Sequence, residues 1–272
     1  MIPFFLESCA GPLFAVYWPP ANQSIKHAVL HVPAFAEEMN KSRRMVALQA
    51  RAMADQGCAV LVLDLFGTGD SSGDFGEANW AIWLQNIADA VAWLKQQGAR
   101  TATLWGLRLG ALLAMDFVNR HEHSIDRLML WQPVLNGDTS VTQFLRLRVA
   151  AAMMNNNMPK ETTSDLKRQL LDGIGVEVAG YRLHPELIKP LIALRADRLS
   201  LCTVKEIALF EVLANADTPV SMPVTQFFSA LQETPVKVSL TKSVGDSFWA
   251  NQEITEAQDL IELSCEWVKQ WQ

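Results

Sequence analysis

Long hydrophobic runs are missing from this sequence of 272 residues. The longest uninterrupted apolar stretches, such as Cys58–Leu63, fall far short of the ~18 residues that a membrane-spanning helix needs. The first residues, Met1–Leu6, carry no basic region and no small-residue cleavage site, so we expect no signal peptide. The sequence therefore predicts a protein without a membrane span.

Cysteine is scarce as well, and no Cys-x-x-Cys pair occurs. Widely spaced cysteines are typical of buried thiols in a reducing compartment, so we expect a cytoplasmic protein. The four are Cys9, Cys58, Cys202 and Cys265. The tripeptide His121-Glu122-His123 superficially resembles a metal site, but its place between a helix and a strand favours an exposed polar turn. No cofactor motif is present, and we expect neither a metal nor a cofactor.

An excess of positive charge is also absent, because 23 Lys and Arg face 29 Asp and Glu, for a net charge of −6. This balance argues against nucleic acid as the main partner. Half of the residues are hydrophobic and 19% are charged, so the chain can bury a sizeable core. Such a composition excludes disorder, collagen and coiled coil.

Short β-rich apolar runs alternate with helical patterns along the chain. Several runs are apolar at consecutive positions, which is typical of strands covered on both faces and favours a parallel sheet. The predicted strands are Ala28–Pro33, Cys58–Asp64, Thr101–Trp105, Arg127–Gln132, Glu206–Leu213 and Val236–Thr241, with Phe14–Trp18 as an antiparallel edge strand. The predicted helices are Lys41–Gln56, Asn79–Gln97, Arg108–Asn119, Pro223–Gln232 and Glu253–Gln270. The fold class is therefore α/β, with a mostly parallel, doubly wound sheet.

One segment breaks this alternation, because Asn136–Leu201 shows only helical patterns and loops. Its charge also differs, since residues 143–200 carry nine basic and six acidic residues while the whole chain is acidic. We interpret 136–199 as a helical cap inserted into a core made of 1–135 and 200–272. An ordinary set of connecting helices is the alternative.

Ligands of open α/β sheets bind at the carboxyl ends of the strands, and two glycine-rich loops follow strands here. The first is Asp64-Leu65-Phe66-Gly67-Thr68-Gly69-Asp70-Ser71-Ser72-Gly73. The second, Gly106-Leu107-Arg108-Leu109-Gly110, has the glycine spacing of a nucleophile elbow, Gly-x-Ser-x-Gly. Together they resemble the α/β-hydrolase superfamily, in which the first loop supports the floor of the active site. The resemblance implies an α/β-hydrolase fold.

Aligned with that superfamily, two of the three catalytic positions are replaced. Arg108 occupies the nucleophile position, and a guanidinium, which stays protonated, cannot attack a carbonyl. Asp217, in the loop after Glu206–Leu213, takes the acid position, with Glu211 as its rival inside the strand pattern. Ser247 takes the histidine position, and no histidine follows His184.

The whole chain resembles one branch of the superfamily, the second exosortase A system-associated hydrolase family. The resemblance rests on His31–Met45, on the Arg108 elbow and on the turn Ser247-Phe248-Trp249. It implies a bacterial protein from gene neighbourhoods for exopolysaccharide production and PEP-CTERM sorting, and it establishes no reaction.

Arg108 is expected at a helix start, where a cation is unfavourable by ~0.3–1 kcal/mol unless an anion compensates it. We predict an ion pair with Asp217, and the alternatives are an anion receptor built with backbone N–H groups or a stabiliser of an oxyanion. His31 is a candidate general base oriented by Glu37 or Glu38, against the plainer interpretation of a structural histidine. The candidate catalytic residues are Arg108, Asp217, Ser247 and His31. The candidate ligand-binding residues are Phe35, Glu37, Glu38, Leu109, Phe248 and Trp249.

Two functions of different classes remain open at this point. The first is binding of an anionic or acylated small molecule, or of a partner, without serine-hydrolase turnover. The second is an active ester or thioester hydrolase, or an acyltransferase, that uses Arg108 towards the oxyanion and His31 or Asp217 as base. A purely structural subunit is a third, weaker interpretation, and the sequence leaves homo-oligomer formation open.

Overall fold

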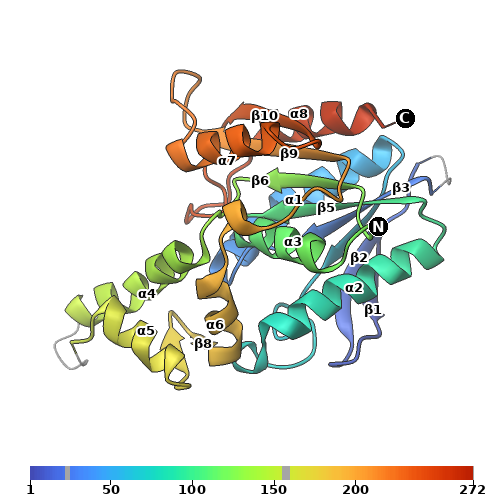
Figure 1. Cartoon of the computed structure of the whole chain (residues 1–272). Helices are drawn as coiled ribbons and strands as arrows, with labels where there is room; N and C mark the ends of the chain where they lie inside the picture. The colour runs from blue at the N-terminus through green and yellow to red at the C-terminus, as the bar shows by residue number, and fades with distance from the viewer. Residues whose placement is uncertain (22–24, 155–159, 272) are drawn as a thin grey trace.

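The computed structural model describes residues 1–21, 25–154 and 160–271. It is built around one large sheet (Figure 1), which has eight strands. The strand order is β1-β2-β4-β3-β5-β6-β9-β10. β1 pairs with β2 and β2 with β4 in antiparallel fashion, and the other neighbours pair in parallel. The strands are β1 (Ile2–Leu6), β2 (Leu13–Trp18), β3 (His27–Val32), β4 (Ala59–Leu63), β5 (Thr101–Leu107), β6 (Arg127–Trp131), β9 (Glu206–Leu213) and β10 (Lys237–Val244).

Helices cover both faces of the sheet. Their bounds are α1 (Glu37–Asp55), α2 (Trp80–Gln96), α3 (Leu109–Arg120), α7 (Met222–Gln232) and α8 (Gln258–Lys269). Apolar side chains of α1 and α8 form one buried cluster with one face of the sheet, and those of α2, α3 and α7 join a second cluster on the other face. The predicted fold class, α/β with a mostly parallel and doubly wound sheet, is confirmed.

The segment between β6 and β9 carries its own elements. They are α4 (Gly137–Met154), α5 (Thr163–Leu171), β7 (Val176–Val178), β8 (Tyr181–Leu183), α6 (Pro185–Ala193) and the short 3-10 helix η2 (Ala196–Arg198). α4, α5 and β8 lie together at one end of the molecule, away from α8 (Figure 1). These elements fall within 136–199, and the assignment of that range to a separate cap stays a prediction.

Two observations describe how this segment joins the rest of the chain. Its two ends meet in an antiparallel bridge between Asn136 and Arg195, so the chain leaves and returns at one place. Its buried residues, such as Leu145 and Leu187, belong to the same apolar cluster as the α2 and α3 face of the sheet. Its packing is therefore continuous with the main core.

Two details of the expected secondary structure and one expectation about burial are wrong. β2 is antiparallel as predicted but is not the edge strand, because Ile2–Leu6 pairs outside it as β1. The segment 136–201 is not purely helical, since β7 and β8 form a hairpin within it. The four cysteines are not all buried, because Cys9 and Cys202 are exposed while Cys58 and Cys265 are buried.

The described residues hold neither a membrane-spanning helix nor a metal-binding cluster. No described helix is both long and apolar enough to cross a membrane. Over the same part of the chain, no group of three or more His, Cys, Asp and Glu side chains is arranged to hold a metal ion, and this includes His121-Glu122-His123.

Candidate functional site

The turn from β5 into α3 holds Arg108 in a strained backbone conformation. Its φ is 56° and its ψ is −117°, in a region that L-residues rarely adopt. The Arg108 N–H donates to the Trp131 carbonyl at 3.0 Å, and the Arg108 carbonyl accepts from the Val134 N–H at 3.1 Å. These bonds fix a sharp strand-to-helix turn of the nucleophile-elbow kind, with arginine at its centre.

The two glycines of this turn are required by close backbone packing. A Cβ on Gly106 would lie 2.4 Å from the Ala111 Cα, and a Cβ on Gly110 would lie 2.2 Å from the Val32 carbonyl oxygen. The Gly-x-x-x-Gly spacing therefore allows α3 to approach both its own strand and β3.

The Arg108 side chain pairs with Glu38 of α1. Its Nε and Nη2 both lie 3.2 Å from Oε1 of Glu38. The guanidinium carbon also lies 5.4 Å from the centroid of the Trp249 ring, within the range of a cation–π contact. The expectation of a compensating anion is confirmed, but the expected partner Asp217 is wrong, because the carboxylate that reaches Arg108 comes from α1.

Burial raises the pKa of the Glu38 carboxyl above its ordinary value, and the neighbouring Arg108 charge opposes this rise only in part. In the described part of the chain, only Nε and Nη2 of Arg108 pair with another side chain, and that side chain is Glu38. Because a guanidinium carries five N–H donors, Nη1 retains donor capacity for another acceptor.

A cleft of about 530 Å³ opens beside Arg108. It lies between the loop after β6, the start of α4, the η2 region and α7. Its polar lining includes Arg108, Gln132, Gln143, Arg195, Glu211 and Ser221, and its apolar lining includes Val134, Leu135, Val224 and Phe227. The cleft thus combines cationic and amide donors with an apolar wall.

Of the two candidate acids, Glu211 lines this cleft. It is 2% exposed within β9, and its Oε2 accepts from the Ser221 N–H at 3.0 Å. Asp217 lies in the exposed turn after β9 and does not line the cleft. A catalytic role for Asp217 stays a prediction, and the structure makes Glu211 the better-placed carboxylate.

The turn after β10 brings Trp249 to Arg108 and buries Phe248. Phe248 is 1% exposed and packs against Trp131 and Trp249, with ring centroids 6.2 and 4.9 Å apart. The Lys41 Nζ donates to the Ala250 carbonyl at 3.1 Å and ties this turn to α1. Ser247 is exposed, and its backbone carbonyl accepts hydrogen bonds from the N–H groups of Ala250 and Asn251. Its role in a site stays a prediction.

His31 lies away from the Arg108 cleft. It is 3% exposed within β3, its Nδ1 lies 3.2 Å from the Trp105 carbonyl, and its ring stacks at a tilt on the Trp105 ring. Burial lowers the pKa of His31 to about 3, with a smaller contribution from the Arg43 charge. A base this weak is poorly suited to take a proton from water at neutral pH. Its predicted orientation by Glu37 or Glu38 is not found among the described contacts, where its polar partner is Trp105.

Phe35 and Leu109 line two small enclosed cavities, each of about 10 Å³. Val141, Phe144 and Leu183 of the 136–199 segment form part of one of these walls. A space of this size holds about one water molecule. The inserted helices thus fill the space beside Phe35 and Leu109, and an acyl group does not fit there.

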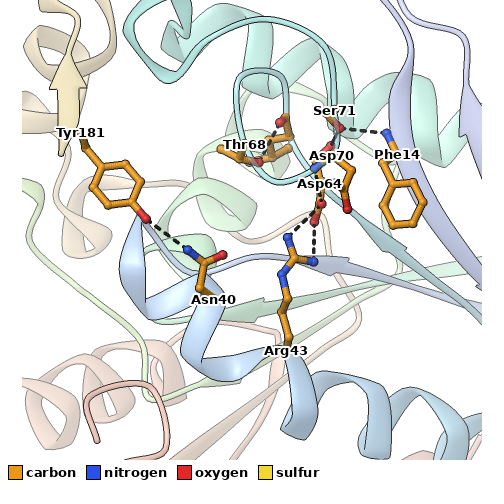
Figure 2. Close-up of polar contacts among 9 residues, drawn as sticks. Phe14, Asn40, Arg43, Asp64, Thr68, Asp70, Ser71 and Tyr181 are labelled. Carbon is orange, nitrogen blue, oxygen red and sulfur yellow. Dashed lines mark hydrogen bonds and ion pairs between the residues drawn. The ribbon is translucent and has the colours of Figure 1, made fainter. Parts of the chain in front are cut away.

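Glu37 is exposed at the start of α1 and contacts β8 instead of Arg108. Its Oε2 accepts from the Tyr181 hydroxyl at 3.1 Å. Asn40 Nδ2 also donates to the Tyr181 hydroxyl, at 3.2 Å (Figure 2). Burial raises the pKa of Tyr181 to about 12, and the Glu37 carboxylate adds to the rise. Glu37 therefore joins α1 to the inserted segment.

Hydrogen bonds and an ion pair hold the Asp64–Gly73 loop in place (Figure 2). The Asp64 carboxylate accepts from Arg43 Nη1 and Nη2 at 3.2 and 3.0 Å and from the Asp70 N–H at 3.1 Å. The Ser71 hydroxyl donates to the Asp64 carbonyl at 2.6 Å and accepts from the Phe14 N–H at 2.8 Å. Ser71 is thus a structural residue that ties the loop to β2, and the expected role of this loop as support for the floor of an active site stays a prediction.

Sequence reasoning missed part of the cleft. Gln132 directly follows β6, with φ of 43°, and its Oε1 accepts from the Val212 N–H at 2.7 Å. The rule that ligands bind at the carboxyl ends of strands could have identified it. Arg195 gave no sequence signal, because its place in the cleft depends on how the chain returns from α6.

Comparisons with known proteins confirm the predicted α/β-hydrolase fold. The family model described as serine aminopeptidase, S33, matches residues 23–193. A comparison with curated proteins found no match. Among solved structures, the chain is similar to Est1E from Butyrivibrio proteoclasticus with bound ferulic acid. The TM-score is 0.68 and the sequence identity is 16%, over 98% of this chain and 97% of that one.

Two further structures show the same fold. XC6422 from Xanthomonas campestris, described as an α/β serine hydrolase without lid, has a TM-score of 0.62 and 12% identity over 99% of this chain and 94% of its own. An α/β serine hydrolase homologue from Coxiella burnetii has a TM-score of 0.57 and 12% identity over 99% and 96%. At these identities the likeness concerns the fold alone.

Proposed function

Because the chain belongs to the serine aminopeptidase S33 family but has arginine at the centre of its elbow, we propose that it binds an anionic or acylated small molecule without serine-hydrolase turnover. The observation that carries this proposal is the Arg108 guanidinium, held by Glu38 and Trp249 beside a cleft of about 530 Å³. An arginine stays protonated at any working pH, so it serves as an anion receptor and not as a nucleophile.

The cleft supports a ligand with an acidic head and an apolar tail. A carboxylate, phosphate or sulfonate accepts hydrogen bonds from the unshared donors of Arg108. Arg195 also lines the cleft, where its Nη2 pairs with the Asp197 carboxylate at 2.8 Å. The tail packs against Val224 and Phe227 of α7. The ligand class is therefore an acyl or alkyl chain that ends in an anion.

The proposed setting is the exosortase and exopolysaccharide system, in a bacterial cytoplasm. Its support is the resemblance of the stretch His31–Met45, the Arg108 elbow and the Ser247-Phe248-Trp249 turn to the second exosortase A system-associated hydrolases. Deletion of the gene should lower exopolysaccharide yield, and an Arg108→Ala copy should fail to restore it. Full restoration by that copy would separate the biological role from the cleft.

The burial of Glu211 at the same cleft favours a second candidate. In it the chain is an ester or thioester hydrolase, or an acyltransferase, in which Arg108 binds the oxyanion and Glu211 takes a proton from the attacking water or alcohol. Glu211 accepts the proton of the attacking water or alcohol as its oxygen bonds to the acyl carbon. The leaving alcohol or thiol receives that proton when its own bond to the acyl carbon breaks. This candidate requires turnover that Glu211→Gln abolishes.

Calorimetric titration with hexanesulfonate tests the first proposal, because the probe has a fixed negative charge and a short tail. We expect saturable binding to the wild type and at least tenfold weaker binding to Arg108→Ala. Arg146→Ala is the matched control, since Arg146 is exposed on α4 outside the cleft. Equal affinity for all three proteins, or no binding to the wild type, would reject the proposal.

Hydrolysis of nitrophenyl esters and acyl thioesters by the same proteins separates the two candidates. Background rates for every variant are expected under the binding proposal. Turnover by the wild type that is lost in both Arg108→Ala and Glu211→Gln would establish the enzyme instead.

A further inference from the structure

A second cavity, of about 220 Å³, lies between α1 and the sheet. Residues of β2, β3, β4 and α1 form its walls, and it shares no lining residue with the Arg108 cleft. Its apolar walls come from Val16, Trp18, Met39, Val46, Val62 and Leu63, and its polar lining is His31, Arg43 and Asp64. The cavity is thus mostly apolar, with few polar groups to orient a ligand, as small-molecule sites commonly are.

His31 presents an unused hydrogen-bond acceptor to this cavity. A carbonyl oxygen only accepts, so the Nδ1 atom 3.2 Å from the Trp105 carbonyl carries the ring proton. The other nitrogen, Nε2, is then an unprotonated acceptor, and no partner for it is recorded among the described residues. Nε2 is not among the unpartnered polar atoms that the protein encloses completely. We therefore infer that Nε2 faces the cavity that His31 lines.

The charges beside His31 limit what this acceptor can bind. The pKa of His31, lowered to about 3 by burial, keeps the ring neutral at physiological pH, so it does not attract an anion. The Arg43 charge, which contributes to that lowering, disfavours a cation next to the ring. The fitting partner for Nε2 is therefore a neutral group that donates one hydrogen bond.

Asp64 does not compete for such a ligand. Its Oδ1 accepts from Arg43 Nη1, and its Oδ2 accepts from Arg43 Nη2 and from the Asp70 N–H. The Asp64 carboxylate is thus satisfied by the protein itself. Arg43 keeps further N–H donors that can reach the oxygen of a bound hydroxyl.

The size of the cavity sets the size of the ligand. The cavity opens to solvent at a rim where Arg43 and Ala47 are exposed, and its volume of about 220 Å³ exceeds the roughly 150 Å³ of an enclosed cavity that accepts benzene, so it accommodates a ring with a small substituent or a short branched chain. We infer that this cavity is a binding site for a small neutral phenol or alcohol, whose hydroxyl donates to His31 Nε2 and whose hydrocarbon part packs between α1 and the β2–β4 strands. This site is separate from the anionic ligand of the Arg108 cleft.

Titration of 15N-histidine-labelled protein with 4-methylphenol tests this inference, with 4-methylanisole as the matched probe that lacks the donor. We expect a saturable shift of the His31 Nε2 resonance with the phenol and binding about three- to tenfold tighter than that of the anisole. No saturable shift, or equal affinity for the two probes, would overturn the inference. This comparison uses the wild type and does not depend on a variant that folds.

Two variants localise the site. His31→Phe removes the acceptor, so the preference for phenol over anisole should disappear. Ala47→Phe places a ring at the exposed rim of the cavity and should weaken both probes while leaving hexanesulfonate binding at the Arg108 cleft unchanged. Unchanged phenol affinity in both variants would place the binding elsewhere, and a simultaneous loss of sulfonate binding in Ala47→Phe would contradict the independence of the two sites.

Discussion

The Nη2 atom of Arg108 lies 3.2 Å from Oε1 of Glu38, which joins the turn after β5 to the first turn of α1. Both side chains are partly exposed, at 22% and 33%, so the ion pair is not sealed in the core. A cation at the start of α3 is unfavourable for that helix, and the Glu38 charge offsets this cost. The same pairing leaves part of the guanidinium available for a ligand.

The first prediction concerns the pH dependence of anion binding. Burial raises the pKa of Glu38, so this carboxyl becomes neutral at a higher pH than an ordinary glutamate does. A neutral Glu38 releases Arg108 and no longer repels an anion. The affinity for hexanesulfonate, whose charge is constant, should therefore increase as the pH falls through that raised pKa.

Glu38→Gln is the control for this effect. It should bind hexanesulfonate more tightly than the wild type at pH 7 and should lose most of the pH dependence. Calorimetric titration between pH 7.5 and pH 5 measures both quantities. A wild-type affinity that stays flat or decreases toward acid would contradict the role given to Glu38.

The second prediction is that Arg108→Ser does not restore a serine hydrolase. A serine nucleophile needs an adjacent base, and the candidate His31 is held by Trp105 in a different cavity. The new serine should react with a fluorophosphonate probe no faster than background, as measured by mass spectrometry of the intact protein. Stoichiometric labelling of position 108 would show that a base lies within its reach.

Much of the fold was predictable because buried parallel strands leave a strong pattern. The range Glu206–Leu213 is reproduced without change as β9. Gly57 and Gly98, which follow the ends of α1 and α2, have φ of 87° and 104°, a conformation that favours glycine at a helix end. β1 and the β7–β8 hairpin were missed because strands of three to five residues with exposed faces carry little periodicity. Tertiary pairing, not local pattern, forms them.

The site was predictable only in part. Glycine spacing located the elbow, since Gly106 and Gly110 are required by backbone contacts that any residue with a Cβ would break. The partner of Arg108 was predicted wrongly as Asp217, because nothing in the sequence shows that Glu38 of α1 reaches the elbow. The choice depends on the angle at which α1 approaches the elbow, and local sequence does not encode that angle.

The third prediction tests the close approach at the elbow. Gly110→Ala would place a Cβ 2.2 Å from the Val32 carbonyl, so β3 and α3 would have to separate. We expect a loss of about 3 kcal/mol in the free energy of unfolding, from urea denaturation. Gly98→Ala has no atom within 4 Å of its new Cβ and suffers only from its positive φ, so a loss of about 1 kcal/mol is expected. Equal losses would mean that backbone contact is not what requires Gly110.

The fourth prediction concerns the serines of the glycine-rich loop. Ser71→Ala removes a donor to the Asp64 carbonyl and an acceptor for the Phe14 N–H, so we expect about 1–3 kcal/mol of destabilisation. Ser72→Ala, the neighbouring control, loses one exposed bond to the Pro12 carbonyl and should cost less than about 1 kcal/mol. Urea denaturation of both variants measures the difference, and a larger loss in Ser72→Ala would reverse the structural roles given to them.

The last prediction follows from the buried neutral imidazole of His31. Its pKa is about 3 in the folded protein, whereas an unfolded histidine titrates near 6.5. Between these values the unfolded chain binds a proton that the folded protein does not, so the free energy of unfolding falls as the pH decreases. From pH 7 to pH 5 this histidine alone should remove about 2 kcal/mol of stability.

His31→Phe cannot take up that proton, so its stability should decrease by about 2 kcal/mol less than that of the wild type over the same interval, whatever the other groups contribute. Urea denaturation of both proteins at the two pH values measures this difference, and parallel losses would mean that His31 is charged or solvated in the folded state, which would also remove the acceptor that its cavity offers.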